Sequence, residues 1–349
     1  MALILFPLLA FFVSVALFGW SLVLFPRLKL LDFPERYGLS RPRIPYPAGI
    51  VAVLLFLIFF LSIVPWSMQN VGLALGILTL CIFCFFDDLR PLPVALRLPV
   101  HIGVSLLIFA SGSRIYTLTS PLPSLTGSDI LSLDRIDVTL PFFGALPVIS
   151  GLFTVVWIGL TINALNWFDG IPGQVSVLAT IGFLTIGFLS LSARVNQPEL
   201  ALLAFILCAI SAGGMLFDLL PPRLLIGDTG AMFYGLMLGV LTIYAGGKVA
   251  TAFLVLGVPL VDFIIVATRR MLRGQSPFLH TKEHLHDLLL ARGWKSAHVI
   301  MLTAGIGTAF GATALFLSTF GKFVAGILLF VLMIGLSRWA GDARMHHKP

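Results

Sequence analysis

The feature that most constrains this chain is a series of long apolar runs separated by short polar connections. Apolar residues make up 58% of the 349 residues and charged residues only 11%, whereas a soluble domain usually carries about 25% charge. A helix needs about 20 mostly apolar residues to cross a bilayer. We therefore expect an all-α, polytopic integral membrane protein with one transmembrane domain over residues 1–349.

The apolar runs predict eleven spans, with ten as the alternative because Pro and Gly interrupt the flanks of the fourth and fifth. The first run lacks a basic start and a small-residue cleavage site, so we interpret it as a span rather than a signal peptide. The predicted spans are 3–25, 47–64, 70–86, 95–112, 146–164, 175–192, 199–217, 229–245, 249–268, 297–317 and 322–338.

Basic residues predict the orientation, because Lys and Arg are enriched in cytoplasmic connections. Alternate connections hold 17 of the 22 basic residues, which predicts an outside N-terminus, a cytoplasmic C-terminus and a main outward loop at about 114–145, with at most one short hairpin. The cytoplasmic connections are then about 26–46, 87–97, 165–174, 218–228 and 269–296.

The net charge of +7 reflects this bias. It suits anionic lipid headgroups or an anionic substrate. Nucleic-acid binding is excluded, because the basic residues are spread over several loops without interleaved aromatic side chains.

Carboxylates recur at the ends of the apolar runs, although a charge at a helix centre costs about 2.5–3.5 kcal/mol on insertion scales. The predicted topology places most of them on the cytoplasmic side, which indicates one site for a cation, a phosphate or both. We interpret Asp218 as a boundary charge outside that site. The carboxylates concerned are Asp87, Asp88, Asp169, Asp218, Asp228 and, within the ninth run, Asp262.

Three segments add polar groups to this face. Asn163 and Asn166 share a helix side shortly before Asp169 and Gly170, and amide oxygens can bind a metal. Asp228 follows Gly227 at a helix start, where it could also be a simple cap. Adjacent carboxylates such as Asp87 and Asp88 repel unless a cation or a proton lies between them, although a boundary charge is the alternative.

The loop 269–296 is basic and contains histidines, and its second half has helix signals that end at Gly293. Arg270, His284 and His286 suit a pyrophosphate, with an ordinary solvated loop as the alternative. Arg97 suits a phosphate as well as a membrane anchor.

In order, these motifs resemble the polyprenyl-phosphate N-acetylhexosamine-1-phosphate transferases, and more closely the bacterial undecaprenyl-phosphate GlcNAc-1-phosphate branch of glycosyltransferase family 4. The resemblance runs from Arg41 to Gly293. Its motifs are Asp87-Asp88, Asn163-x-x-Asn166-x-x-Asp169-Gly170, Gly227-Asp228-x-Gly230, Pro259-x-x-Asp262, Ser276-Pro-Phe and His284-x-His286.

That resemblance implies a Mg²⁺-dependent enzyme, with Mn²⁺ as an alternative ion, in the bacterial cytoplasmic membrane with its site on the cytoplasmic face. Undecaprenyl phosphate attacks a UDP-N-acetylhexosamine and UMP leaves, which starts a lipid-linked cell-envelope glycan such as O-antigen. The implied partners are these two substrates, membrane lipids and a second copy of the chain.

The resemblance also implies residue roles. Asp87, Asp88, Asp169 and Asp228 are expected to be catalytic, and Asp228 with Asn166 to hold the metal. The expected substrate-binding residues are Arg97, Asn163, Asn166, Gly170, Asp262, Arg270, His284 and His286.

Four residues depart from the family pattern: Pro172, Ala231, Thr281 and Asp287. They leave the sugar open, with a 6-deoxy N-acetylhexosamine among the candidates. Two other functions remain: an ion-coupled transporter, which predicts acids near the membrane midplane and inverted repeats, and a non-catalytic protein that binds lipid-linked sugars.

Overall fold

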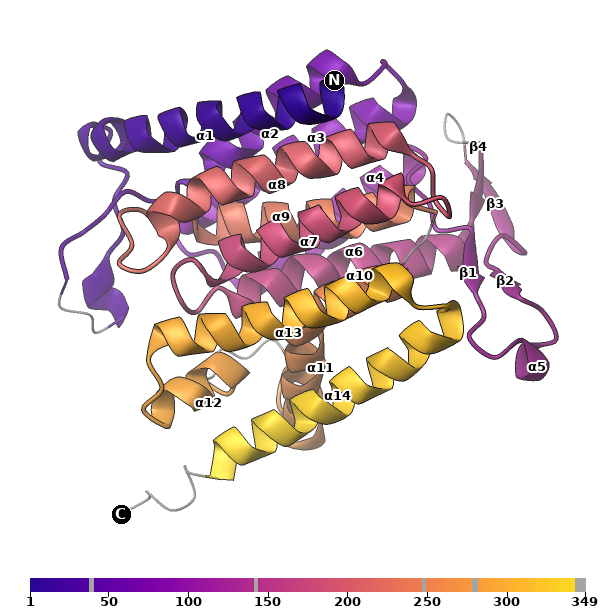
Figure 1. The fold of residues 1–349 in the computed structure, drawn as a ribbon. Helices are drawn as coiled ribbons and strands as arrows, with labels where there is room; N and C mark the ends of the chain where they lie inside the picture. The colour runs from indigo at the N-terminus through magenta and orange to yellow at the C-terminus, as the bar shows by residue number, and fades with distance from the viewer. Residues whose placement is uncertain (38–40, 141–143, 247–248, 278–281, 343–349) are drawn as a thin grey trace.

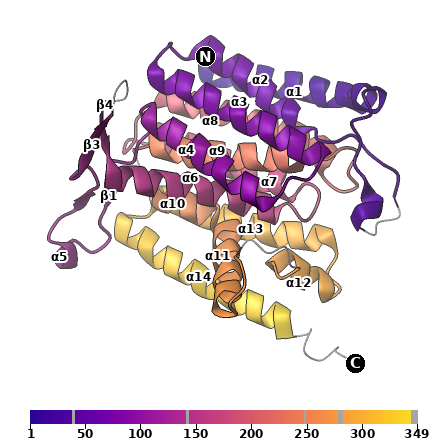
Figure 2. The same cartoon turned by 180° about the vertical axis from the view of Figure 1, so that it is seen from behind.

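The computed structural model describes residues 1–37, 41–140, 144–246, 249–277 and 282–342, and their chain is mostly helical (Figure 1). The long helices lie side by side in one layered bundle, with the strands gathered at one end (Figures 1 and 2). The helices of ten or more residues are α1 (Ala2–Arg27), α2 (Gly49–Ile63), α3 (Met68–Leu89), α4 (Val94–Ala110), α6 (Val148–Phe168), α7 (Gln174–Leu191), α8 (Pro198–Asp218), α9 (Gly227–Tyr244), α11 (Gly257–Leu272), α13 (Ser296–Phe316) and α14 (Thr319–Asp342).

Every predicted span overlaps a helix, the ninth being divided between α10 (Val249–Val255) and α11. Among the described residues, seven helices are long and apolar enough to cross a membrane, or eight if α10 and α11 count as one. Two of the others, α2 and α4, are apolar but shorter. The count of eleven spans and the direction of the termini therefore stay predictions.

Helix α9 lies at the centre of the bundle. Almost all of its side chains are buried, and it contacts α2, α3, α6, α7 and α8. It is less apolar than the peripheral helices because it begins with Gly227-Asp228-Thr229-Gly230. A helix that is surrounded by protein needs close packing rather than the hydrophobicity that lipid contact requires.

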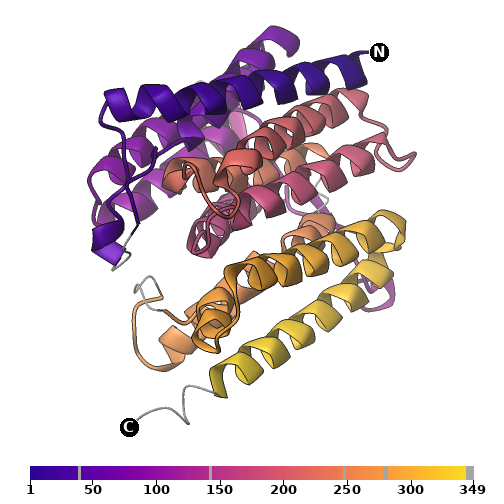
Figure 3. The same ribbon diagram turned by 60° about the vertical axis from the view of Figure 1, so that its left-hand side comes forward.

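The last part of the chain, from α11 to α14, adds a separate layer (Figure 3). Helices α10 and α11 meet at 87°, so α11 runs across the direction of its neighbours (Figures 1 and 2). A second apolar core joins α11, α13 and α14 to the short helix α12 (Leu285–Ala291). The predicted helix before Gly293 thus exists, and it packs beside α14.

The predicted outward loop contains more strand than the sequence indicated. Strands β1 (Thr117–Thr119) and β2 (Ile130–Ser132) pair antiparallel, and so do β3 (Asp137–Leu140) and β4 (Gly144–Pro147). A four-residue helix, α5 (Pro123–Thr126), lies between the strands of the first pair, and a 3₁₀ turn spans Pro34–Tyr37 elsewhere. The chain is therefore mostly helical, as predicted, but this connection holds two short hairpins where the sequence indicated at most one.

The start of α2 packs directly on the start of α9, and a glycine permits the contact. A Cβ atom added to Gly49 would lie 2.2 Å from the backbone nitrogen of Gly230. The Gly49 N–H also donates to the Ile226 carbonyl at 2.8 Å. The position of α9 therefore depends on the absence of a side chain at residue 49.

We predict that Gly49→Ala destabilises the folded protein by about 1–3 kcal/mol, the usual cost of overpacking. The measurement is thermal unfolding of the purified protein in detergent. Gly103→Ala is the control, because a Cβ at Gly103 would have no neighbour within 4 Å. Equal melting temperatures for the two variants would contradict the assigned packing.

Candidate active site

The carboxylate of Asp88, at the end of α3, caps the N-terminus of α9. It accepts hydrogen bonds from the Asp228 N–H at 2.9 Å, the Thr229 N–H at 3.0 Å and the Thr229 hydroxyl at 2.6 Å. It also accepts one from the Tyr46 hydroxyl. The first N–H groups of a helix have no partner within the helix, and a negative charge there is stabilising. Asp88 thus caps α9 from another helix and places Asp228 beside α3.

Gly227 makes this cap possible. Its φ angle of +71° is in the left-handed region, which glycine adopts without strain. A Cβ atom at this position would also lie 2.9 Å from an Asp88 carboxylate oxygen and 2.8 Å from Tyr46. The Gly227-Asp228 motif therefore has a structural reason, because only glycine lets α3 approach the helix start this closely.

Arg97, near the start of α4, joins two of the predicted catalytic carboxylates. Its Nε lies 3.0 Å from Asp87 Oδ2, and its Nη1 lies 3.4 Å from Asp228 Oδ2. The other oxygen of Asp87 accepts from the Leu92 N–H at 2.6 Å. Asp87 is buried, whereas the Asp228 side chain remains 30% exposed. The guanidinium is thus one source of positive charge among these acids.

Asp169 follows the last residue of α6 and lies close enough to the same acids to sense their charge. Burial raises the pKa of Asp169 well above its ordinary value, and the nearby carboxylates of Asp218, Asp228 and Asp88 raise it further. The residue as a whole is nevertheless partly exposed. A site that concentrates negative charge in this way favours a cation.

Asp218 differs from its interpretation as a boundary charge. It is only 1% exposed, and it accepts from the Gly173 N–H at 3.1 Å and from the Ser176 hydroxyl at 2.7 Å. These bonds tie the end of α8 to the start of α7. Asp218 therefore shapes the loop that follows Asp169 and adds charge beside the site.

The two asparagines of α6 have different surroundings. The Asn163 amide donates to the Gly159 carbonyl at 2.7 Å and lies 3.3 Å from His101 Nδ1 on α4. The Asn166 amide nitrogen is buried and has no hydrogen-bond partner within the described chain. Such a buried donor normally finds a partner, so Asn166 is the better candidate for contact with a bound group.

Asp262 on α11 positions the histidine segment. Its Oδ2 lies 2.7 Å from His284 Nδ1, and its Oδ1 accepts from the Leu285 N–H at 2.9 Å. Because Asp262 is buried and holds the N-terminus of α12, its role is to fix His284. Sequence reasoning found this residue, but only the fold identifies the histidine that it contacts.

Trp167 and Arg270 lie beside His284 and form a second group of site residues with it. The Arg270 guanidinium lies 5.2 Å from the centre of the Trp167 ring, donates to the Pro277 carbonyl at 2.7 Å and lies 3.7 Å from a Glu283 oxygen. Trp167 also contacts the His284 ring edge-on, with 5.6 Å between the ring centres. The cluster consists of Trp167, Gly170, Asp262, Arg270, Glu283, His284 and His286, and we call it the histidine cluster.

His286 stacks on His284 with ring centres 5.8 Å apart and meets Phe168 edge-on. Burial lowers the pKa of His286 despite the nearby Asp287 carboxylate, so its ring is neutral near pH 7. A Cβ atom at Gly170 would lie 2.0 Å from His286 Nε2. Gly170 is therefore a contact surface for the imidazole.

Comparison with known proteins identifies the family of the chain. The family model for glycosyl transferase family 4 matches residues 70–246. The chain belongs to glycosyl transferase family 4. The match includes Arg97, both asparagines and the acidic residues from Asp87 to Asp228, but it ends before Asp262 and the other residues that follow it in the histidine cluster.

Curated relatives extend the similarity. A protein of Bacillus subtilis (strain 168), named probable undecaprenyl-phosphate N-acetylglucosaminyl 1-phosphate transferase, is 25% identical over 75% of this chain and 70% of its own length. The undecaprenyl-phosphate alpha-N-acetylglucosaminyl 1-phosphate transferase of Escherichia coli (strain K12) is 25% identical over 92% of this chain and 87% of its own length.

The departures from the expected family pattern lie in different parts of the site. Asp287 lies 3.7 Å from His286 Nε2. Ala231 is fully buried in α9, and Pro172 is partly buried in the loop after Asp169. Thr281 lies outside the described residues. Asp287 is therefore the departure with a contact to a residue of the histidine cluster.

The donor set suits a magnesium ion that is shared with a substrate. Among the described residues, no three His, Cys, Asp or Glu side chains form a group that could hold a metal by themselves. Mg²⁺ usually takes only one or two carboxylates and fills its other positions with phosphates and water. Asp228 is partly exposed beside a helix start, and Asp169 lies among other acids, so the residues fit such an ion.

We predict that Asp88→Asn and Asp87→Asn loosen different segments. Asn at residue 88 lacks one acceptor of the α9 cap, and losing a cap costs about 0.5–2 kcal/mol. Hydrogen exchange should therefore speed up at Asp228 and Thr229 in Asp88→Asn but at Leu92 in Asp87→Asn. Equal exchange patterns in the two variants would contradict the assignment of the cap.

We also predict that Gly170→Ala displaces His286, because the added methyl group occupies the position of the imidazole. The measurement is carbethoxylation of His286, followed by mass spectrometry of its peptide. Gly159→Ala, on the helix that precedes Gly170, is the control, since a Cβ there has no neighbour within 4 Å. Unchanged reactivity of His286 in Gly170→Ala would disprove the contact.

Proposed function

We propose that this protein transfers a sugar 1-phosphate from a UDP-N-acetylhexosamine to undecaprenyl phosphate and releases UMP. The substrate most consistent with the names of the relatives is UDP-GlcNAc. The product is a lipid-linked sugar at the start of a cell-envelope glycan. We place the reaction at the cytoplasmic face of the bacterial inner membrane, which is where the basic connections of the chain are predicted to lie.

The proposal rests on one observation: carboxylates and basic side chains lie close together at one end of the bundle. Carboxylates from α3 and α9 contact Arg97, Asp169 just after α6 lies near the α9 carboxylate, and the end of α6 also contacts the histidine cluster. Acids can share a divalent cation with phosphates, while Arg and His can bind phosphate oxygens directly. A diphosphate donor and a phosphate acceptor require both kinds of group.

We assign the acceptor phosphate to Arg97 and Asp87. The second pKa of a phosphate monoester is about 6, so the attacking oxygen is largely unprotonated near neutral pH and needs orientation more than a strong base. Arg97 can neutralise that phosphate, and Asp87 holds the guanidinium in place at 3.0 Å. Asp88 has its oxygens engaged by α9, so its proposed role is to position Asp228.

We assign the UDP-sugar donor to the histidine cluster, at the same end of the bundle. Arg270 and His284 are held by Trp167 and Asp262 respectively, which orients donors of hydrogen bonds toward a pyrophosphate. A bound Mg²⁺ would neutralise charge that develops on the phosphates, with Asp228 and Asn166 as its proposed ligands and Asp169 beside them. The acceptor oxygen forms a bond to the sugar-linked phosphorus, and the bond from that phosphorus to UMP breaks.

The alternative of an ion-coupled transporter has less support. That function favours acids near the membrane midplane, whereas Asp87, Asp88, Asp169 and Asp228 all lie at or just beyond the ends of their helices. Asp262 is nearer the middle of α11, but it is engaged by His284 and Leu285. Charge at one end suits chemistry at a surface better than passage through the bundle.

We predict Mg²⁺-dependent release of UMP when the purified protein receives undecaprenyl phosphate and UDP-GlcNAc, with UDP-GalNAc and 6-deoxy analogues as parallel donors. Asp228→Ala should lower the turnover by about 100-fold or more, because it removes charge stabilisation at the reacting phosphates. Asp129→Ala, in the exposed β1–β2 connection, is the control. UMP release from none of the donors would overturn the proposed function.

A further inference from the structure

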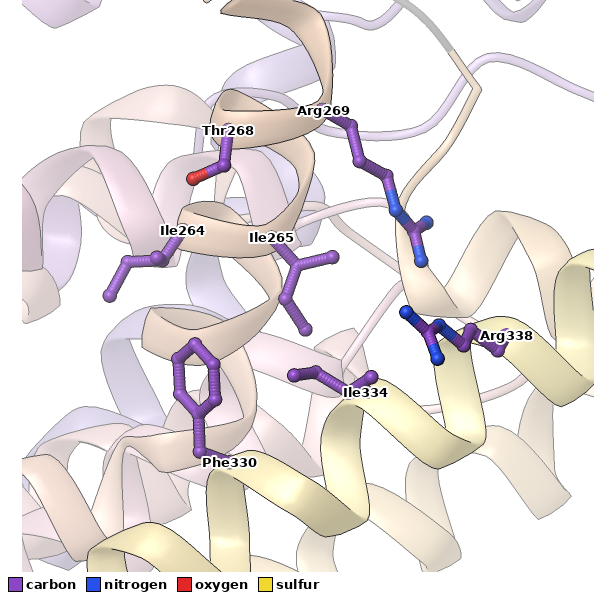
Figure 4. A pocket seen from close by; sticks show the side chains of 7 residues that line it. All are labelled: Ile264, Ile265, Thr268, Arg269, Phe330, Ile334 and Arg338. Carbon is purple, nitrogen blue, oxygen red and sulfur yellow. The ribbon is translucent and has the colours of Figure 1, made fainter. Parts of the chain in front are cut away.

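A groove lies between α11 and α14, beside the histidine cluster but outside it. Its volume is about 240 Å³. The walls are apolar, and two arginines and a threonine supply its polar groups (Figure 4). Its lining residues are Ile264, Ile265, Thr268 and Arg269 of α11 and Phe330, Ile334 and Arg338 of α14.

The arginines give this groove an unbalanced charge. The guanidinium groups of Arg269 and Arg338 point toward one another from the two helices (Figure 4), and no carboxylate is among the lining residues. The nearest acid in the loop that follows α11, Glu283, is engaged by Arg273 at 2.7 Å and by Arg270 at 3.7 Å. Like charges that face each other repel, so an anion between them would be stabilised.

The surroundings indicate a lipid rather than a soluble anion. Only 17% of the most apolar window of α14 is buried, and Met271 and Leu272 at the end of α11 are 56% and 83% exposed. Both helices therefore present apolar surface to their surroundings. Pockets for soluble small molecules usually measure about 300–1,000 Å³, so this groove suits a headgroup phosphate and the first carbons of one chain.

We propose that the groove binds an anionic glycerophospholipid, with the phosphate between Arg269 and Arg338 and an acyl chain along Ile264, Phe330 and Ile334. This lipid is distinct from the polyprenyl acceptor. The same helix, α11, carries Asp262 and Arg270, which belong to the histidine cluster. A bound lipid would therefore join α14 to the helix that positions that cluster, without touching the reacting groups.

The test measures lipid binding to the full-length protein in nanodiscs of phosphatidylcholine, with or without phosphatidylglycerol. Native mass spectrometry counts the phosphatidylglycerol that each protein retains after release into detergent. The double variant Arg269→Gln with Arg338→Gln should bind phosphatidylglycerol about tenfold more weakly or worse, because each arginine contributes separately to an anionic headgroup. Arg27→Gln is the matched control, since Arg27 is exposed at the end of α1.

Two further arms identify the ligand. Arg269→Lys with Arg338→Lys keeps both charges and should retain more phosphatidylglycerol than the glutamine variant, which guards against a loss caused by misfolding. Glycerol phosphate, which lacks acyl chains, should not displace the lipid. Three results would each overturn the proposal, whatever the UMP assay shows. The first is equal retention of phosphatidylglycerol by wild type and the glutamine variant. The others are displacement of the bound lipid by glycerol phosphate, and displacement by undecaprenyl phosphate but by no glycerophospholipid.

Discussion

The arrangement of the site depends on one interaction, the capping of α9 by a carboxylate from α3. Asp88 accepts two backbone N–H groups and two hydroxyl groups at the point where α9 begins. A partly buried carboxylate such as that of Asp88 is costly unless its oxygens accept hydrogen bonds, and a helix start is costly unless its N–H groups have acceptors. The helix N–H groups donate to the carboxylate oxygens, so both groups are satisfied and Asp228 is fixed beside Arg97 and Asp87.

The helices themselves were predictable, because lipid and protein interiors impose the same simple pattern on sequence. A run such as 199–217 must be helical to satisfy its backbone in an apolar medium, and α8 covers it. The strands between Thr117 and Pro147 were harder to predict. Short hairpins in an exposed connection depend on local pairing, and their apolar residues show little periodicity.

The residue types of the site were predictable, but their pairings were not. Asp87 and Asp88 are neighbours in sequence, yet one faces Arg97 and the other faces α9. A search for charged residues could not find Tyr46 and Trp167. An aromatic residue in an apolar chain usually has only a packing role. Asp218 resembled a boundary charge because its partners, Gly173 and Ser176, belong to a helix far from it in sequence.

The end of α6 has a geometric consequence. Within eight residues this segment reaches His101 through Asn163, Arg270 through Trp167, the carboxylates through Asp169 and His286 through Gly170. Each helical residue turns the chain by about 100°, so a single insertion here would rotate every later contact away from its partner. The length of this segment is therefore fixed by all four contacts at once, in addition to the side chain that each contact requires.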